Sequence, residues 1–129
     1  MEKEIIMPKG MHAPKLPFSR ACKKGNMVYA AAHVAIDKTG EVIGVGDIKA
    51  QTTFILNDIV KIVEAAGGKK GDIVKCTVLL ANNDYWSGLN EAFREFFAGD
   101  FPARTTIICR IPGPFGEKLL VDIDAVAIL

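Results

Sequence analysis

The sequence predicts one α+β domain, spanning residues 1–129, in which two helices cover one face of a mixed β-sheet. Two segments, 47–66 and 86–97, place apolar residues at the spacing of an amphipathic helix. Runs rich in β-branched and apolar residues lie on either side of them, as is typical of strands. No linker or repeat divides the chain, and its length is sufficient for one domain with its own core.

Composition and charge exclude several classes of protein. Half of the residues are hydrophobic and 24% are charged, which excludes a disordered chain. The net charge is +1 and the basic residues are scattered, which argues against nucleic-acid binding, since that function typically needs a basic stripe. No apolar run has the length of a membrane span or a signal peptide, so we expect a soluble, cytoplasmic protein. Cys22, Cys76 and Cys109 are widely spaced and form no CxxC pair, which predicts free thiols and no metal site.

The first half of the chain is predicted to contain three strands and a helix. We expect strands at 4–7, 18–23 and 27–34, with a hairpin turn at 24–26 and a short extended segment at 41–43. Asp47 is a candidate N-cap, and Gly67-Gly68 ends the helix that follows it. The lone GxG at 44–46 lacks the third glycine of a phosphate loop and is interpreted as an ordinary connection.

The second half is predicted to add a helix and three strands. We expect strands at 72–81, 104–111 and 118–129, and a helix that begins after the Asn82-Asn83-Asp84 capping cluster. Gly99 ends this helix. The predicted order is therefore β-β-β-α-β-α-β-β.

The sheet face away from the helices is predicted to be neither a solvated surface nor a core. In the last strand Val121, Ile123 and Ala125 alternate with Asp122 and Asp124, so the aspartates should lie on that face. By the same alternation we expect it to carry Lys75, Thr77, Leu79, Arg104, Thr106, Ile108, Tyr29, Ala31 and His33. Such a mixture predicts subunits packed sheet to sheet, the alternative being a long loop over this face. Cys109, with the opposite alternation to Arg104, should then face the helices.

Arg104 is the leading candidate for a functional residue. Pro102 favours an extended backbone before it, so the guanidinium enters at the start of an apolar strand. Arginine is rarely buried without a partner, and its planar fork suits a carboxylate. That carboxylate is either that of a ligand or, in a structural ion pair at the seam between subunits, that of Asp122 or Asp124.

Several segments together resemble the RidA/YjgF family, the reactive-intermediate deaminases, which are also described as L-PSP endoribonucleases. No single segment decides the resemblance, but their order and spacing over nearly the whole chain do. The matching segments are Gly25–Tyr29, Asp37–Val42, Glu64–Gly67, Gly71–Lys75, Asn90–Phe93 and Phe101–Arg104.

The resemblance implies a chorismate-mutase-like fold and a homotrimer with clefts between subunits. It also implies hydrolysis of 2-imino acids, or of their enamine tautomers such as 2-aminoacrylate, to 2-keto acids and ammonia without a cofactor. In that family the arginine of the Pro-Ala-Arg motif, here Arg104, binds the substrate carboxylate. Asn90 matches a family position near the cleft.

The chain departs from the family pattern around this arginine. The usual glutamate of the last strand falls at Asp122, the usual cysteine at Thr106 and a common tyrosine at Phe18. The usual Ser-Gly pair falls at Ala31-Ala32, with His33 next. We therefore expect Arg104 and Asp122 to be catalytic, and Phe18, Ala32, Asn90 and Thr106 to line the substrate site.

Two other functions stay open at this point. The first is a non-catalytic trimer whose clefts bind small carboxylates or hold client proteins, which the departures favour. The second is RNA cleavage, which usually needs a paired acid and base; the chain offers only His12 and His33, and its charge is nearly balanced.

Overall fold

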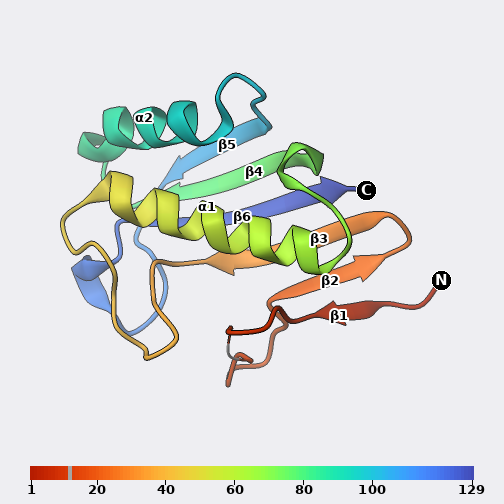
Figure 1. The fold of residues 1–129 in the computed structure, drawn as a ribbon. Helices are drawn as coiled ribbons and strands as arrows, with labels where there is room; N and C mark the ends of the chain where they lie inside the picture. Colours follow the sequence, from red (N-terminus) through yellow and green to blue (C-terminus); the bar gives the residue numbers. More distant parts are fainter. Residues whose placement is uncertain (12) are drawn as a thin grey trace.

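The computed structural model describes residues 1–11 and 13–129, so His12 lies outside the described residues. Six strands form one sheet in the order β1-β2-β3-β6-β4-β5, with two α-helices on one of its faces (Figure 1). The elements are β1 (Glu4–Ile6), β2 (Ala21–Lys24), β3 (Met27–His33), α1 (Ile48–Ala65), β4 (Ile73–Leu80), α2 (Trp86–Phe97), β5 (Ala103–Ile108) and β6 (Val121–Ile128), with short 3-10 helices at Lys70–Asp72, Asn83–Tyr85 and Gly116–Lys118. This architecture confirms the predicted α+β fold class and the predicted order of elements.

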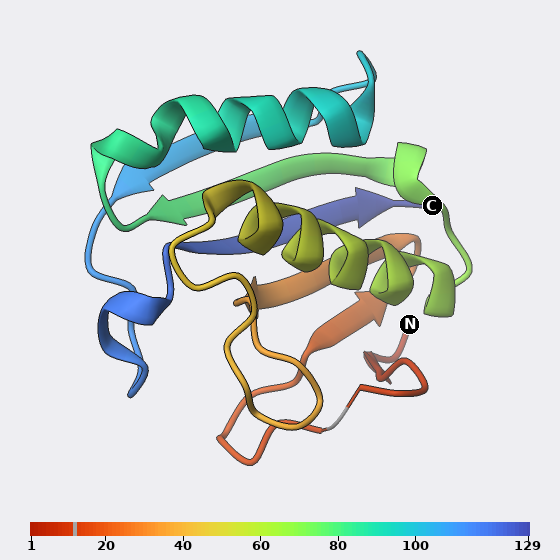
Figure 2. The same ribbon diagram turned by 60° about the vertical axis from the view of Figure 1, so that its left-hand side comes forward.

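The two helices lie side by side on the same side of the sheet. Figure 2 shows α1 crossing the middle of the sheet and α2 lying beside it, above β5 at one edge. Helix α1 begins where Asp47 accepts a hydrogen bond from the backbone N–H of Ala50 at 3.0 Å, as predicted. The helices approach closely at Gly88, where a Cβ atom would overlap the side chain of Ile48.

The core fills the space between the helices and the sheet. The apolar side of β6 is completely buried, as its alternation predicts. It packs with the inner stripe of α1, which consists of Ile55, Leu56, Ile59, Ile62 and Val63. The opposite face of the sheet is not covered by the described chain where Tyr29, Ile107 and Ile128 lie, because these side chains are 53%, 46% and 43% exposed. The long loop considered as a cover is therefore absent from that part of the face.

Some predicted strands are shorter in the structure. Residues 18–20 and 109–111 lie outside strands, and 41–43 contributes only an isolated bridge between Ile36 and Val42. These segments lie next to loops. There the apolar sequence pattern continues beyond the last residue that has a neighbouring strand to pair with.

Two predictions of orientation were wrong. Strand β5 runs parallel to β4 with Arg104 opposite Cys76 and Thr106 opposite Val78. Neighbours in a ladder share a face, and Cys76 and Val78 are buried under the helices, so Arg104 and Thr106 face the helices as well, and Ile108 follows them. Cys109 lies beyond the end of β5, so the predicted strand alternation does not extend to it, and it is partly exposed.

The second error concerns His33. A register shift between Ala30 and His33 places His33 opposite Ile123, a buried residue of the helix-covered face. A bulge adds a residue to one strand and so reverses the alternation that follows it. The side chain of His33 is therefore only 3% exposed. It does not lie on the face of the sheet opposite the helices, which we call the open face.

A buried side chain ties α1 to the segment before β6. The amide of Gln51 donates to the carbonyl of Lys118 at 2.7 Å and accepts from the N–H of Leu120 at 2.8 Å. The neighbouring Thr52 is equally buried, but its hydroxyl has no hydrogen-bond partner among the described residues.

These neighbours give a matched test of stability. We expect Gln51→Leu to lower the free energy of unfolding by about 3 kcal/mol, because it leaves a backbone N–H and a carbonyl buried without partners. Thr52→Val should change it by less than about 0.5 kcal/mol or stabilise the protein, because it removes an unpaired hydroxyl. Urea denaturation measures both values, and equal losses in the two variants would contradict this account.

Candidate ligand site around Arg104

Arg104 lies at the start of edge strand β5 and packs under α2. Its Nη2 donates to Oδ1 of Asn90 at 2.6 Å. Its guanidinium carbon lies 4.8 Å from the ring centroid of Phe93 and 5.4 Å from that of Trp86. The three partners are spaced along α2 so that they lie on one side of the helix, which therefore holds the guanidinium in place.

The charge of Arg104 has no carboxylate partner in the described chain. Arg104 makes no ion pair with Asp122 or Asp124 among the described residues of one chain, so an ion pair with either aspartate across a seam between subunits stays a prediction. Partial burial lowers the pKa of the guanidinium, and the charge of a Cys76 thiolate would raise it. Arginine remains protonated in proteins and carries more N–H donors than Asn90 uses, so it is equipped to bind an anion.

A surface pocket of about 360 Å³ opens at this guanidinium. Its walls are Asn90, Phe93, Arg94, Phe101, Pro102 and Arg104. Arg94 follows Asn90 by one helical turn and makes no ion pair or side-chain hydrogen bond among the described residues. The pocket thus combines two cationic groups with apolar walls, which suits a small anionic molecule.

Sequence reasoning missed four of these contacts, namely Trp86, Phe93, Arg94 and Phe101. The sequence pattern accounted for the aromatic residues of α2 only as the apolar side of an amphipathic helix, and Phe93 does pack in the core while also contacting Arg104. The spacing of Trp86, Asn90 and Arg94 on one helical stripe was the available signal.

Asp122 lies on the opposite face of the sheet from Arg104. It is paired with Leu79 in the ladder between β4 and β6, and Asp124 lies two residues further along. The Asp122 side chain is buried, and its Oδ1 has no hydrogen-bond partner among the described residues. Burial, and secondarily the charge of Asp124, raises the pKa of Asp122 to about 6. One chain therefore does not bring the two predicted catalytic residues together.

The other predicted site residues are divided in the same way. Asn90 contacts Arg104, and Thr106 shares its face of the sheet. Phe18, in the segment before β2, is 53% exposed, and Ala32 is exposed beside the bulge in β3. Neither residue lines the Arg104 pocket, so within one chain they do not share a site with Arg104.

His33 is a buried, neutral side chain. Its Nδ1 lies 2.6 Å from the carbonyl of Ala31 and therefore donates to it, whereas Nε2 has no partner among the described residues. Burial lowers the pKa of His33 more than the carbonyl raises it, and Arg20 lowers it further. A neutral, buried imidazole is not placed to exchange protons with a ligand in the Arg104 pocket.

The described residues contain no group of three or more His, Cys, Asp or Glu side chains placed to hold a metal ion. Among these residues there is also no helix with the length and apolar character needed to cross a membrane.

Comparisons with known proteins identify the family. The family model described as Endoribonuclease L-PSP matches residues 10–129. The RutC family protein PH0854 of Pyrococcus horikoshii is 38% identical over 127 residues, 97% of each chain. The crystal structure of YyfA from Yersinia pestis, of the Rid protein family, has a TM-score of 0.88 and 30% identity, and covers 99% of this chain and 100% of that one. The structure of Escherichia coli TdcF with bound serine has a TM-score of 0.86 and 26% identity, over 98% of both chains. The chain therefore belongs to the Endoribonuclease L-PSP family, whose members are also named RidA, YjgF and RutC.

Proposed function

We propose that the protein hydrolyses 2-imino acids, such as 2-iminopropanoate and 2-iminobutanoate, and their enamine tautomers to 2-keto acids and ammonia. The observation that carries this proposal is the guanidinium of Arg104, which is held by Asn90 and two aromatic rings but lacks a carboxylate partner among the described residues. A 2-imino acid supplies that carboxylate. TdcF, a relative that binds serine, offers support, because serine carries an α-carboxylate of the same kind.

The chemistry needs few protein groups. An imine carbon is already electrophilic, so water adds to it directly and gives a carbinolamine. The C–N bond then breaks, the protonated nitrogen leaves as ammonia, and the 2-keto acid forms. Holding the carboxylate in a two-point contact orients the imine toward the water, and orientation of this kind is worth about 7 kcal/mol in good cases.

Asp122 is the proposed acid/base group. Its raised pKa places the carboxyl near the range in which it both accepts and releases protons at neutral pH. Its Oδ1, which has no hydrogen-bond partner among the described residues, can accept a hydrogen bond from the attacking water. Because Asp122 and Arg104 lie on opposite faces of one sheet, a site that uses both must be shared between subunits.

A homotrimer satisfies this requirement if the sheet edge that carries Arg104 on β5 of one subunit meets the open face that carries Asp122 of the next. The half-exposed Tyr29, Ile107 and Ile128 on that face supply apolar surface for the contact. In the proposed cleft Phe18 and Ala32 form an apolar wall, Asn90 positions Arg104, and Thr106 offers a hydroxyl. We place this activity in the cytoplasm, without a cofactor.

A non-catalytic carboxylate-binding trimer, with or without a role in holding client proteins, is the second candidate. It keeps Arg104 and its pocket but assigns no chemistry to Asp122. The departures from the family pattern at Phe18, Ala31, Thr106 and Asp122 favour it, because Phe18 and Ala31 cannot donate hydrogen bonds from their side chains. RNA cleavage is less well supported, because His33 is buried and leaves no histidine pair among the described residues.

Substitution of Arg104 tests the central claim. We expect Arg104→Ala to lower imine hydrolysis about 100-fold or more, because the substrate loses its orientation, and Arg104→Lys to recover only part, because the fork is lost. The assay generates 2-aminoacrylate from serine with a dehydratase, traps it competitively with semicarbazide and records pyruvate release.

Arg110 is an exposed arginine beyond β5, and Arg110→Ala is the matched control, which should hydrolyse the imine at the wild-type rate. Undiminished hydrolysis by Arg104→Ala would refute the mechanism. If no form of the protein accelerates hydrolysis but pyruvate binding is lost in Arg104→Ala alone, the non-catalytic candidate holds.

The pKa of Asp122 predicts how activity depends on pH. If the ionised carboxylate activates water, the rate should fall as pH drops through about 6, where Asp122 becomes protonated. Asp122→Asn should lower the rate about 10²–10⁴-fold and abolish that dependence. Asp124→Asn should move the midpoint of the rate profile to lower pH, because the charge of Asp124 contributes to the raised pKa. Initial rates from pH 5 to 8, corrected for uncatalysed hydrolysis, provide the measurement; an unchanged profile in Asp122→Asn would exclude this role.

Mixing inactive variants tests whether the site is shared. Arg104→Ala subunits retain Asp122, and Asp122→Asn subunits retain Arg104. If each cleft takes one residue from each of two subunits, oligomers reassembled from both variants should regain part of the wild-type rate, whereas each variant alone stays inactive. Size-exclusion chromatography with light scattering checks reassembly. Mixed oligomers that form but show no activity would contradict a shared site.

A further inference from the structure

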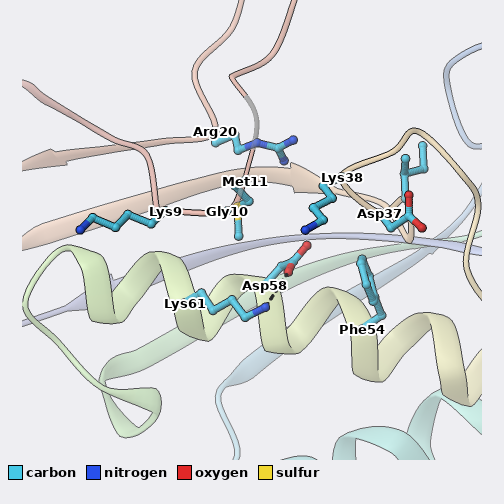
Figure 3. Close-up of a pocket in the computed structure, with 10 residues that line it drawn as sticks. Lys9, Gly10, Met11, Arg20, Asp37, Lys38, Phe54, Asp58 and Lys61 are labelled. Carbon is cyan, nitrogen blue, oxygen red and sulfur yellow. Dashed lines mark ion pairs between the residues drawn. The ribbon is translucent and has the colours of Figure 1, made fainter.

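A second pocket, of about 330 Å³, lies on the helix-covered side of the sheet between α1 and the segments before β2 and after β3 (Figure 3). It shares no residue with the Arg104 pocket. Its walls are Lys9, Gly10, Met11, Arg20, Ile36, Asp37, Lys38, Phe54, Asp58 and Lys61. The proposed deaminase mechanism does not use this pocket.

Positive charge predominates in the pocket, with four cationic side chains against two carboxylates. One carboxylate is already committed to its own loop. Oδ1 of Asp37 accepts from the N–H and the hydroxyl of Thr39 at 2.9 and 2.6 Å, and from the N–H of Glu41 at 3.1 Å. These hydrogen bonds, led by the Thr39 hydroxyl, lower the pKa of Asp37. Asp58 is therefore the carboxylate that faces the cations.

Asp58 interacts only weakly with Lys61. Its Oδ1 lies 3.9 Å from Nζ of Lys61, which is too far for a hydrogen bond. Burial raises the pKa of Asp58, although Lys61 and Arg20 act in the opposite direction. Lys38 makes no ion pair or side-chain hydrogen bond among the described residues, and Figure 3 shows it projecting over α1 toward Asp58. Lys9 extends away from this group along α1 in the same view.

An apolar surface adjoins the charges. Phe54, Asp58 and Lys61 fall at helical spacing on one stripe of α1, so the aromatic ring lies one turn before the carboxylate. Phe54 and Met11 pack against the core and are only partly buried. A ligand here meets a fixed apolar wall on one side and flexible cations on the other.

We propose that this pocket binds a small organic phosphate monoester. Its phosphate lies among Arg20, Lys38 and Lys61, and its apolar or aromatic group lies on Phe54. A dianion matches the excess of positive charge, and lysine ammonium groups bind phosphate as point charges. The volume is at the small end of the range of ligand pockets, which suits one phosphate and one ring rather than a larger cofactor.

Isothermal titration of the full chain with phenyl phosphate tests the proposal, with inorganic phosphate and benzoate as comparison probes. Phenyl phosphate should bind most tightly, and added salt should weaken its binding. Lys38→Glu and Lys61→Glu should each weaken it about tenfold or more. Lys24→Glu, the same change of charge at the exposed β2–β3 turn, is the matched control and should leave binding unchanged.

Two further variants separate the charge from the apolar wall. Asp58→Asn should tighten phenyl phosphate binding several-fold, because it removes the carboxylate that repels the phosphate. Phe54→Leu should reduce the preference for phenyl phosphate over inorganic phosphate. Equal affinity for phenyl phosphate and inorganic phosphate would mean that the pocket recognises only the phosphate group. That result would overturn the organic-ligand proposal.

Other outcomes also overturn it. These are no saturable binding of phenyl phosphate at millimolar concentration, equal effects of Lys38→Glu and Lys24→Glu, weaker binding in Asp58→Asn, or benzoate binding as tightly as phenyl phosphate. Lys38 lies on an exposed loop, so its substitution does not depend on repacking α1 if Lys61→Glu fails to fold. Imine hydrolysis measured on the same preparations should be unaffected, which separates failure of this proposal from failure of the proposed deaminase.

Discussion

The parallel pairing of β4 with β5 is the constraint on which the candidate site depends. With Cys76 opposite Arg104, the guanidinium must lie on the side of the sheet that carries α2. A shift of one residue would turn it to the open face, because side chains alternate along a strand. At the edge of the sheet, α2 supplies Asn90 and the rings of Trp86 and Phe93, so the charge is held without being neutralised.

The same register determines what one chain can do alone. The β4–β6 ladder turns Asp122 to the open face, where it is buried and pairs with Leu79. A central strand thus separates the carboxylate of Asp122 from the guanidinium of Arg104. Their opposite charges do not cancel within the chain, so each residue retains the property proposed for it: Arg104 its unpaired cation, and Asp122 its raised pKa.

Much of the fold could be predicted from the sequence, because local signals and tertiary packing agree there. The inner stripe of α1, the Asp47 cap and the alternation of β6 each point to the structure that is observed. The orientation of β5 could not be predicted in this way. Its sequence, Ala103-Arg104-Thr105-Thr106-Ile107-Ile108, has no clear polar and apolar faces, so only its pairing with β4 decides which side faces α2.

His33 shows a second limit. The predicted alternation of side chains in β3 continues from Ala30 to His33, but in the structure a bulge interrupts it. The sequence Ala30-Ala31-Ala32 contains no residue type that predicts a bulge. The consequence is chemical as well as geometric, since burial makes His33, one of the two histidines considered for RNA cleavage, a neutral side chain in the protein interior. Arg104 itself was predictable as a candidate, because an arginine at the start of an apolar strand demands a partner; which partner it had was not predictable.

The separation of Arg104 from Asp122 has a consequence for evolution of the site under the proposed mechanism. When each cleft is built from two subunits, every substitution on the open face acts on both assembly and chemistry. Asp122 is one methylene shorter than the glutamate that the family resemblance implies at this position, so under the proposed mechanism only a change in the approach of the partner sheet would restore its distance to the imine. In the proposed trimer, the exposed side chains of Tyr29, Ile107 and Ile128 would set that approach. Under the proposed mechanism, catalytic strength would therefore depend on how closely those side chains allow two sheets to pack, and less on which polar groups surround Arg104.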